Sequence, residues 1–223
     1  TNLVLNVTGD YYIRFADPEV LRVLLANGVG DGTGITEEQA EAVTSIGQWF
    51  KGNTAITSFD EFEKFTGVKT VGSYGWTGGG FNECASLQKV SLPPTATALC
   101  NACFNNTTML ERIGGLENIK TIGSSNYEGF TFAASGIKEI NLSSLTDIGG
   151  SSNFKNSKVE IVHSLGSITQ LTGNTANNNG QFFGCTELKK VVLPDGLTLI
   201  GYCCFQNCSS LSDINIPQSV EEI

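Results

Sequence analysis

The chain has 223 residues with 40% hydrophobic and 16% charged side chains, which allows one folded domain, or one domain with a small appendage. Asp and Glu number 22 against 13 Lys and Arg, so the net charge of −9 argues against nucleic acids and anionic membranes as partners. No apolar run reaches the ~18 residues of a membrane-spanning helix, and the first residues lack a signal-peptide pattern. We therefore expect no direct membrane insertion, with any signal peptide removed before Thr1.

Two short helices are predicted near the N-terminus. Pro18 stands at the first position of one helix, which the pair Asn27-Gly28 ends. Thr36 opens a second helix through a capping box, and this helix is predicted to run to about Phe50. A repeat array exposes an apolar end unless another element covers it, so we interpret residues 1–57 as a helical N-terminal cap.

The segment between these helices resembles a calcium-binding loop. Its candidate ligands are Asn27, Asp31, Thr33 and Glu38. Val29 supplies no side-chain oxygen at the third loop position, and the usual apolar residue comes one place late. Two interpretations follow, a weak calcium site and a loop that only turns the chain.

A repeat organises residues 58–223. The frame Phe-x-x-Cys-x-x-Leu-x-x-[Val/Ile]-x-[Leu/Ile]-Pro occurs at residues 81–93, 182–194 and 205–217. Two apolar residues three places apart recur after it, at Val68/Val71, Ala96/Leu99, Ile119/Ile122, Leu145/Ile148, Ile168/Leu171, Leu197/Ile200 and Val220/Ile223. The period of roughly 23 residues lies within the range of leucine-rich repeats. Each unit is too short to bury its own apolar residues, so neighbouring coils must stack as a solenoid.

Each coil is expected to place one strand and one aromatic ring against the core. Leu87, Val90 and Leu92 have the spacing of inward-facing strand residues. One phenylalanine recurs per coil and is predicted to form an internal stack, with members Phe81, Phe104, Phe130 or Phe132, Phe154, Phe182 and Phe205.

The cysteines and the single histidine argue against catalysis. Seven cysteines are an odd number, so a complete disulfide framework is excluded. Three of them occupy the interior position three places after the repeat phenylalanine, and four precede the next one, which favours buried thiols over a metal or redox site; they are Cys84, Cys185 and Cys208, then Cys100, Cys103, Cys203 and Cys204. Common hydrolase and nucleotide motifs are absent, and any histidine-based mechanism would need His163. We expect no enzyme activity, no cofactor and no metal.

The full frame resembles the BspA-like leucine-rich repeats of bacterial cell-surface proteins. The resemblance covers residues 58–223 and is weakest over 124–180, while residues 58–72 resemble the beginning of such an array. It implies a leucine-rich-repeat solenoid of about six to seven coils, predominantly β with short irregular connections, and α+β overall because of the helical cap. It also implies a secreted or surface-displayed recognition module without catalysis. The alternative is a structural spacer in a longer cell-surface protein.

Two surfaces are candidates for binding a protein or glycan. The first is the outward face of the repeat strands, with Lys89, Arg112, Glu139, Asn141, Ile161, His163, Lys190 and Val192. The second is a rim of longer loops that alternate with shorter ones and carry Tyr74, Trp76, Tyr127 and Asn177. A solvated strand face and ordinary polar turns remain the alternatives for the two surfaces.

The C-terminal coil is expected to be incomplete. Ile223 is the second residue of an apolar pair, and the given sequence has no polar capping segment after it. An uncovered strand edge promotes association. We expect either that the natural protein continues past Ile223 or that the chain associates with itself through this end.

Overall fold

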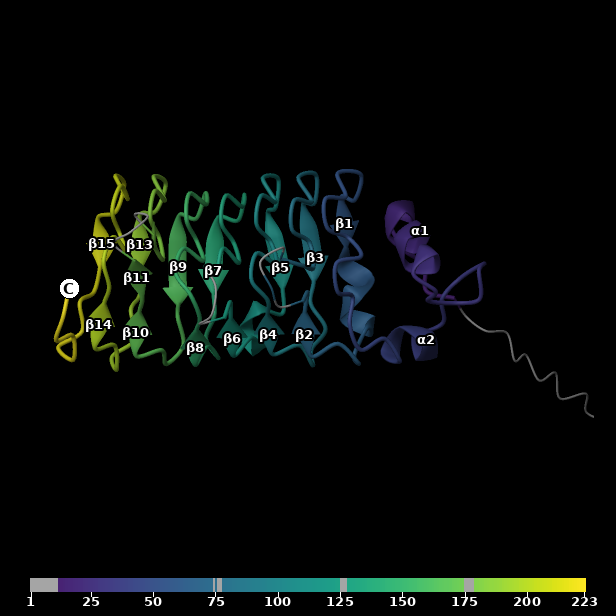
Figure 1. The fold of residues 1–223 in the computed structure, drawn as a ribbon, viewed down its shortest axis with the longest axis horizontal. Helices are drawn as coiled ribbons and strands as arrows, with labels where there is room; N and C mark the ends of the chain where they lie inside the picture. Colours follow the sequence, from purple (N-terminus) through teal and green to yellow (C-terminus); the bar gives the residue numbers. More distant parts are fainter. Residues whose placement is uncertain (1–11, 74, 76–77, 125–127, 175–178) are drawn as a thin grey trace, which may run out of the picture.

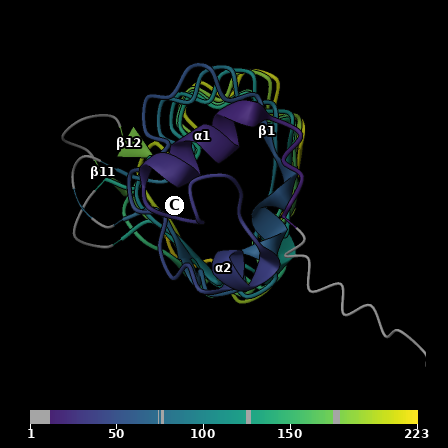
Figure 2. The same cartoon turned by 90° about the vertical axis from the view of Figure 1, so that its right-hand side faces the viewer.

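The computed structural model describes residues 12–73, 75, 78–124, 128–174 and 179–223. In these residues the chain winds into an elongated solenoid whose coils stack along one axis, with the helical segments at one end (Figure 1). Viewed along that axis, the coils surround a common centre (Figure 2). The predicted solenoid, predominantly β with short irregular connections, is confirmed.

The predicted repeat strands form a parallel row, called here the first strand row. Its members are β1 (Ser58–Phe59), β3 (Lys89–Ser91), β5 (Arg112–Gly114), β7 (Glu139–Asn141), β9 (Ile161–Ser164), β13 (Lys190–Val191) and β15 (Asp213–Ile214). Inward and outward residues alternate along each strand, as in β3, where Val90 is buried and Lys89 is exposed. The pairing follows the repeat, since Lys89 lies beside Arg112 and Val90 beside Ile113.

The second residues of the recurring apolar pairs lie in a second row of parallel strands, called here the second strand row. Its members are β2 (Thr70–Val71), β4 (Ala98–Leu99), β6 (Thr121–Ile122), β8 (Asp147–Ile148), β10 (Gln170–Leu171) and β14 (Leu199–Ile200). Their buried residues align from coil to coil, with Leu99 beside Ile122 and Ile122 beside Ile148. Sequence analysis predicted the apolar pairs but not that their second residues lie in strands.

Three short elements interrupt this regular winding. The 3-10 helix η1 (Asp60–Lys64) follows β1, and η2 (Leu116–Asn118) follows β5. The antiparallel hairpin of β11 (Gly173–Asn174) and β12 (Asn179–Gly180) projects from one side of the solenoid (Figure 2).

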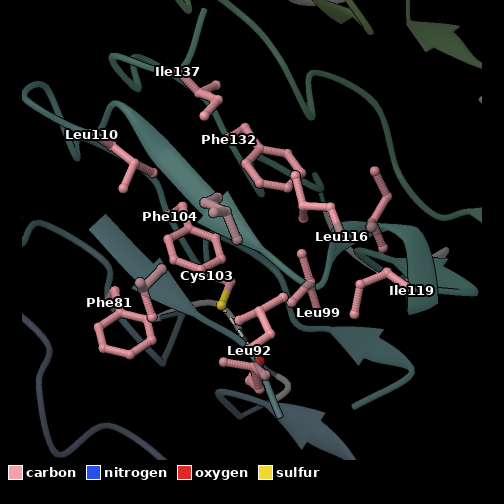
Figure 3. Close-up of a cluster of buried hydrophobic side chains, with 14 of the residues drawn as sticks. Phe81, Leu92, Leu99, Cys103, Phe104, Leu110, Leu116, Ile119, Phe132 and Ile137 are labelled. Carbon is pink, nitrogen blue, oxygen red and sulfur yellow. Dashed lines mark hydrogen bonds between the residues drawn. The ribbon is translucent and has the colours of Figure 1, made fainter. Parts of the chain in front are cut away.

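A column of phenylalanine rings runs through the core. Successive rings lie 4.7 to 5.7 Å apart between centroids from Phe81 to Phe205, and Phe81, Phe104 and Phe132 can be followed in Figure 3. The coil in which two phenylalanines were candidates contributes Phe132, which is fully buried. Phe130 is partly exposed and has a positive φ of 52°, so it belongs to the turn that leads into the ring position.

The column also extends toward the N-terminus as far as Phe50. This ring stacks on Phe81 at 5.5 Å, and the Gly80 N–H donates to the Gly47 carbonyl at 2.8 Å. Residues 47–50 therefore pack against the first full coil as another coil would.

The first predicted helix is confirmed and the extent of the second is wrong. The first is α1 (Pro18–Ala26), capped by the Asp17 side chain, which accepts from the Glu19 N–H. The second, α2 (Glu37–Glu41), has the predicted capping box at Thr36 but ends long before Phe50. Gly47 adopts a positive φ of 44°, and the chain leaves the helical path to bury Phe50 in the aromatic column.

Candidate functional site

The outward face of the first strand row displays most of its predicted residues to solvent. Ile161 is half-buried, and the others are exposed: Lys89, Arg112, Glu139, Asn141, His163, Lys190 and Val192. The strand register places Ile161 beside both Glu139 and Lys190. The structure therefore brings the predicted residues onto the same side of successive coils, in two sheets.

A β-bulge shifts one member of this face. Ile140 pairs with Val162, but the next residue, Asn141, pairs with Ser164. His163 is therefore the extra residue in β9, and it is not the neighbour of Asn141 that regular repeat spacing would require. Its Nε2 lies 2.8 Å from a carboxylate oxygen of Glu139, so the histidine leans toward the adjacent coil.

Ion pairs within the face compensate most of its charges. Asp60, at the start of η1, contacts Lys89 at 2.8 Å and Arg112 at 2.9 Å. Lys190 contacts Asp213 at 2.8 Å on the next coil. Such partly exposed pairs each contribute at most about 1 kcal/mol. Their effect is to align neighbouring coils and leave little net charge on the face.

Asp60 is the member of this face that sequence reasoning missed. Burial acts to raise its pKa, but the hydrogen bonds from Lys89 and Ser91 and the charge of Arg112 outweigh burial and hold the pKa below its ordinary value. The carboxylate therefore stays ionised and bridges two strands. In the sequence, Asp60 is recognisable only as an acidic residue at the start of a short helix. That pattern does not reveal partners 29 and 52 residues away along the chain.

An apolar patch interrupts the charged face. Val192 is 39% exposed, and its N–H donates to the Val162 carbonyl at 3.0 Å, which places Val192 in the row next to β9. Ile161 lies in β9, the strand next to the one that Val192 follows, and is paired with Lys190. Called here the Ile161/Val192 patch, this small apolar area has the Glu139–His163 contact on one side and the Lys190–Asp213 pair on the other.

A groove of about 410 Å³ opens near the ends of β3 and β5. Its lining comprises Glu63 and Lys64 of η1, Ser91, Leu92 and Pro94 at and after the end of β3, and Gly114, Gly115, Glu117 and Asn118 at and after the end of β5. The two glycines add no side chains, so the backbone itself forms part of the wall. Sequence reasoning did not find this groove, because it depends on the contact of η1 with the repeat strands.

The predicted loop rim falls on residues that the structure does not describe. Tyr74, Trp76, Tyr127 and Asn177 lie outside the described residues. At the base of that side, the buried Asn179 donates to Glu128 and accepts from Lys155, each at 2.7 Å. The longer connections are thus tied to one another across coils at their bases.

The candidate calcium ligands divide into two groups. The Asp31 carboxylate accepts from the Thr33 hydroxyl at 2.7 Å, from the backbone N–H groups of Thr33 and Gly34, and from the Tyr12 hydroxyl. The Asn27 side chain donates to the Val23 carbonyl at the end of α1, and Glu38 is exposed in α2. The structure therefore brings Asp31 and Thr33 together in a hydrogen-bonded turn, while Asn27 is engaged elsewhere.

The cysteines are free thiols, most of them in the core. Five are buried, and none of the seven, all of which fall in the described part of the chain, forms a disulfide. Burial raises the pKa of Cys84 to about 12 and that of Cys185 to about 11. The Cys185 thiol donates to the Phe154 carbonyl at 2.9 Å, and Cys208 donates to the Phe182 carbonyl at 3.0 Å. The predicted burial is confirmed for five thiols and wrong for Cys203 and Cys208, which are half-buried; the Cys203 thiol donates instead to the Gln206 side chain at 2.6 Å. The described residues contain no group of three or more His, Cys, Asp or Glu side chains able to hold a metal.

Comparison with known proteins agrees with this repeat geometry. Residues 50–180 and 163–223 match the BspA type leucine-rich repeat region, in 6 copies. The chain belongs to the BspA-type leucine-rich repeat family. The match begins at Phe50, the first ring of the aromatic column, and it includes residues 124–180, where the repeat frame is least regular.

A leucine-rich repeat protein from Bacteroides ovatus is similar in structure to this BspA-type chain. The two share 20% sequence identity with a TM-score of 0.48 over 82% of this chain and 55% of that protein, so the chain spans about half the length of its structural neighbour. No curated protein matches the chain. In the described ranges, no helix has the length and apolar character needed to cross a bilayer.

Proposed function

We propose that this BspA-type array is a non-catalytic recognition module, displayed outside the cell, that binds a protein partner through the first strand row. The observation that supports this most is the Ile161/Val192 patch, which is apolar and accessible within an otherwise polar face. Protein interfaces combine an apolar centre with a polar rim in this manner. The flanking contacts of Glu139 and Lys190 would form that rim.

The regular geometry of the array also favours recognition. Parallel strands hold the exposed side chains in a fixed register. The side chains and backbone would therefore lose little conformational entropy when a partner binds. The charges of the face are largely paired internally, so shape and apolar contact would set specificity more than net attraction. A protein partner suits this surface better than a glycan, because no aromatic side chain lies among the predicted strand-face residues.

A binding screen with two matched variants tests the proposal. The chain is applied to an array of immobilised extracellular-matrix proteins and glycans, and each hit is remeasured with Val192→Glu and Gln170→Glu. Gln170 is exposed in the second strand row, so its substitution adds the same charge away from the patch. We expect a protein hit that Val192→Glu weakens at least about tenfold and Gln170→Glu leaves unchanged, since a hot-spot truncation costs more than 1 kcal/mol.

Two outcomes would contradict the proposal. Binding that both variants retain would place the partner on another surface. The absence of any hit would favour the alternative of a structural spacer that presents another domain.

A further inference from the structure

The first strand row is interrupted between β5 and β7. Backbone pairing joins β1, β3 and β5 in one sheet and β7, β9, β13 and β15 in another, with no pairing between the two sets in the described residues. Figure 1 shows β5 and β7 standing apart, whereas the other neighbours of this row run side by side. Residues 111–115 and 138–142 are all described, so the interruption lies within the observed chain.

Strand geometry identifies the backbone groups that face the interruption on β5. The Arg112 N–H donates to the Gln88 carbonyl at 3.1 Å, and the Leu92 N–H donates to the Gly114 carbonyl at 2.9 Å. Residues 112 and 114 therefore point toward β3. Because successive residues of a strand direct their backbone groups to opposite sides, the N–H and C=O of Ile113 point toward β7.

The same reasoning applies to β7. The Ile161 N–H donates to the Lys138 carbonyl at 3.2 Å, and the Leu142 N–H donates to the Ser164 carbonyl at 3.0 Å, so these positions face β9. The backbone groups of Glu139 and Asn141 then point toward β5. The groups of Ile113, Glu139 and Asn141 that face the interruption are called here the open edge.

The core beneath the open edge is intact. The Phe104 and Phe132 rings of the two flanking coils stack at 5.7 Å with an interplanar angle of 2°. In the second strand row the same coils remain paired, with Ile122 beside Ile148. The interruption is thus confined to one wall of the solenoid and is not a general separation of coils.

A second interruption, between β8 and β10 of the second strand row, is treated differently by the sequence. There the Gly150 carbonyl accepts from the Thr172 hydroxyl at 2.5 Å and from the Gln181 amide at 2.8 Å, and the Gly149 carbonyl accepts from Asn153 at 2.9 Å. Side chains thus replace the missing strand partners. Across the described residues, no side chain hydrogen-bonds to the backbone of the open edge.

The open edge is exposed mainly on its β7 side. Glu139 and Asn141 are exposed, whereas Ile113 is only 8% exposed. The groove of about 410 Å³ has no β7 residue in its lining and is separate from the interruption. An incoming chain would therefore first meet the backbone groups of Glu139 and Asn141.

From these contacts we infer that the open edge binds an extended peptide segment of a protein partner through backbone hydrogen bonds. Strand addition of this kind supplies main-chain bonds as the source of affinity, and the segment must present free N–H groups and therefore lack proline along its paired length. The inference rests on the proposed protein-binding function of the first strand row and adds the mode of recognition. It places the peptide between Arg112 and Glu139, and Glu139 pairs directly with Ile161 of the Ile161/Val192 patch.

Amide hydrogen exchange of the free protein is the first test. The amides of Ile113, Glu139 and Asn141 should exchange at least about 100-fold faster than those of Ile140 and Val162, because the last two N–H groups point toward a paired strand and the first three point into the interruption. Equal protection at both sets would mean that β5 and β7 pair in solution, and this result would overturn the inference.

The second test uses a defined peptide probe. The probe has the sequence of residues 158–165, Lys-Val-Glu-Ile-Val-His-Ser-Leu, and its control carries N-methyl groups on alternate backbone nitrogens. We expect the unmodified peptide to bind and to slow exchange at Ile113, Glu139 and Asn141, and the N-methylated peptide to bind at least about tenfold more weakly, since main-chain bonds carry the affinity. Equal binding of the two peptides, no binding, or protection only at residues 213–216 would each overturn the inference.

A pair of variants at one position locates the peptide. Asn141→Pro removes the N–H that faces β5 without removing a bond to β9, whereas Asn141→Ala retains it. Asn141→Pro should abolish binding of the unmodified peptide and Asn141→Ala should preserve it; equal binding to both would overturn the inference. The proposed function is judged separately by Val192→Glu, because that residue is outside the open edge and its effect on a protein hit does not require strand addition.

Discussion

Coils with a thiol and coils with an amide or hydroxyl side chain fill the same interior position, the residue before the ring, in different ways. Where the ring comes five places after the second-row apolar residue, as from Leu99 to Phe104, the residue before the ring is a cysteine. The Cys103 thiol lies 3.5 Å from the Val71 carbonyl, and Cys204 holds the equivalent position 3.4 Å from the Leu171 carbonyl.

The three coils between these two use hydroxyl and amide side chains there instead, namely Thr131, Asn153 and Gln181. Asn153 accepts from the Thr131 hydroxyl at 2.8 Å and donates to Gln181 at 3.0 Å, so the three side chains form a buried chain across coils. The Gly149 and Gly150 carbonyls have no strand partner between β8 and β10, and an amide supplies two donors where a thiol supplies one weak donor. The interruption of the second strand row therefore coincides with the more polar part of the solenoid interior.

The aromatic column should be equally important in both kinds of coil. Phe104 of a thiol coil and Phe154 of an amide coil are both fully buried between two rings. We expect Phe104→Ala and Phe154→Ala each to lower the free energy of unfolding by about 3 to 5 kcal/mol. Urea denaturation measures this, and a difference of more than about 2 kcal/mol between them would show that the two regions differ beyond their polar residues.

The polar residues should differ strongly in importance. Asn153→Ala removes side-chain hydrogen bonds to the Thr131 hydroxyl, the Gly149 carbonyl and the Gln181 oxygen, but Thr131 keeps the Cys100 carbonyl at 3.4 Å and Gln181 keeps the backbone N–H of residue 153 at 3.3 Å. We therefore expect a loss of about 2 to 3 kcal/mol, most of it from the Gly149 carbonyl, which is left without a partner. Cys103→Ala, at the same position in a thiol coil, should cost about 1 kcal/mol. Similar losses in urea denaturation would contradict the proposed difference between amide and thiol coils.

Alkaline pH should lower the stability of the chain through its buried thiols. Burial raises the pKa of Cys100 to about 12 and that of Cys204 to about 11, above the ordinary value of 9.0. Above pH 9 the unfolded chain therefore loses thiol protons that the folded chain retains, so stability is fully present below pH 9 and declines above it. We expect unfolding under reducing conditions to become easier between pH 9 and 10, by up to about 1.4 kcal/mol per pH unit for each buried thiol.

A variant isolates this alkaline effect from other titrations. Burial also raises the pKa of Cys103 well above its ordinary value, so Cys103→Ala should make the decline of stability between pH 9 and 10 shallower. An unchanged slope would mean that thiol ionisation does not cause the decline.

The turn that follows each ring should be the same in both regions. The residue two places after the ring has a positive φ whatever its side chain, for example 58° at Asn106, 51° at Ala134 and 72° at Gly184. Ala134→Gly should therefore raise the free energy of unfolding by about 0.5 kcal/mol, because glycine adopts this conformation without strain. Ala133→Gly, at a neighbouring residue without a positive φ, should lower it by about 1 kcal/mol, and thermal denaturation that ranks the two in the opposite order would contradict this account.

Local sequence rules were sufficient for the repeated parts of the molecule. The spacing of Phe182, Cys185 and Leu188 places all three in the core, because every coil repeats the same turn and strand and its neighbours supply the same contacts. The outward positions of Lys89 and Lys190 followed from strand alternation in the same way.

Tertiary packing decided what repeat spacing alone could not. The second helix ends at Glu41 because Phe50 is buried against Phe81, a contact between distant residues that outweighs local helical preference. The choice of Phe132 over Phe130 depends on which ring continues the column.

The candidate binding surface was predicted only in part for the same reason. Strand alternation identified its exposed residues, but the bridging of two strands by Asp60 and the bulge at His163 depend on contacts between coils. The open edge between β5 and β7 likewise follows from how whole coils lie against one another. A single sequence encodes the period of a solenoid locally, whereas the places where neighbouring coils fail to pair are set by the packing of several coils at once.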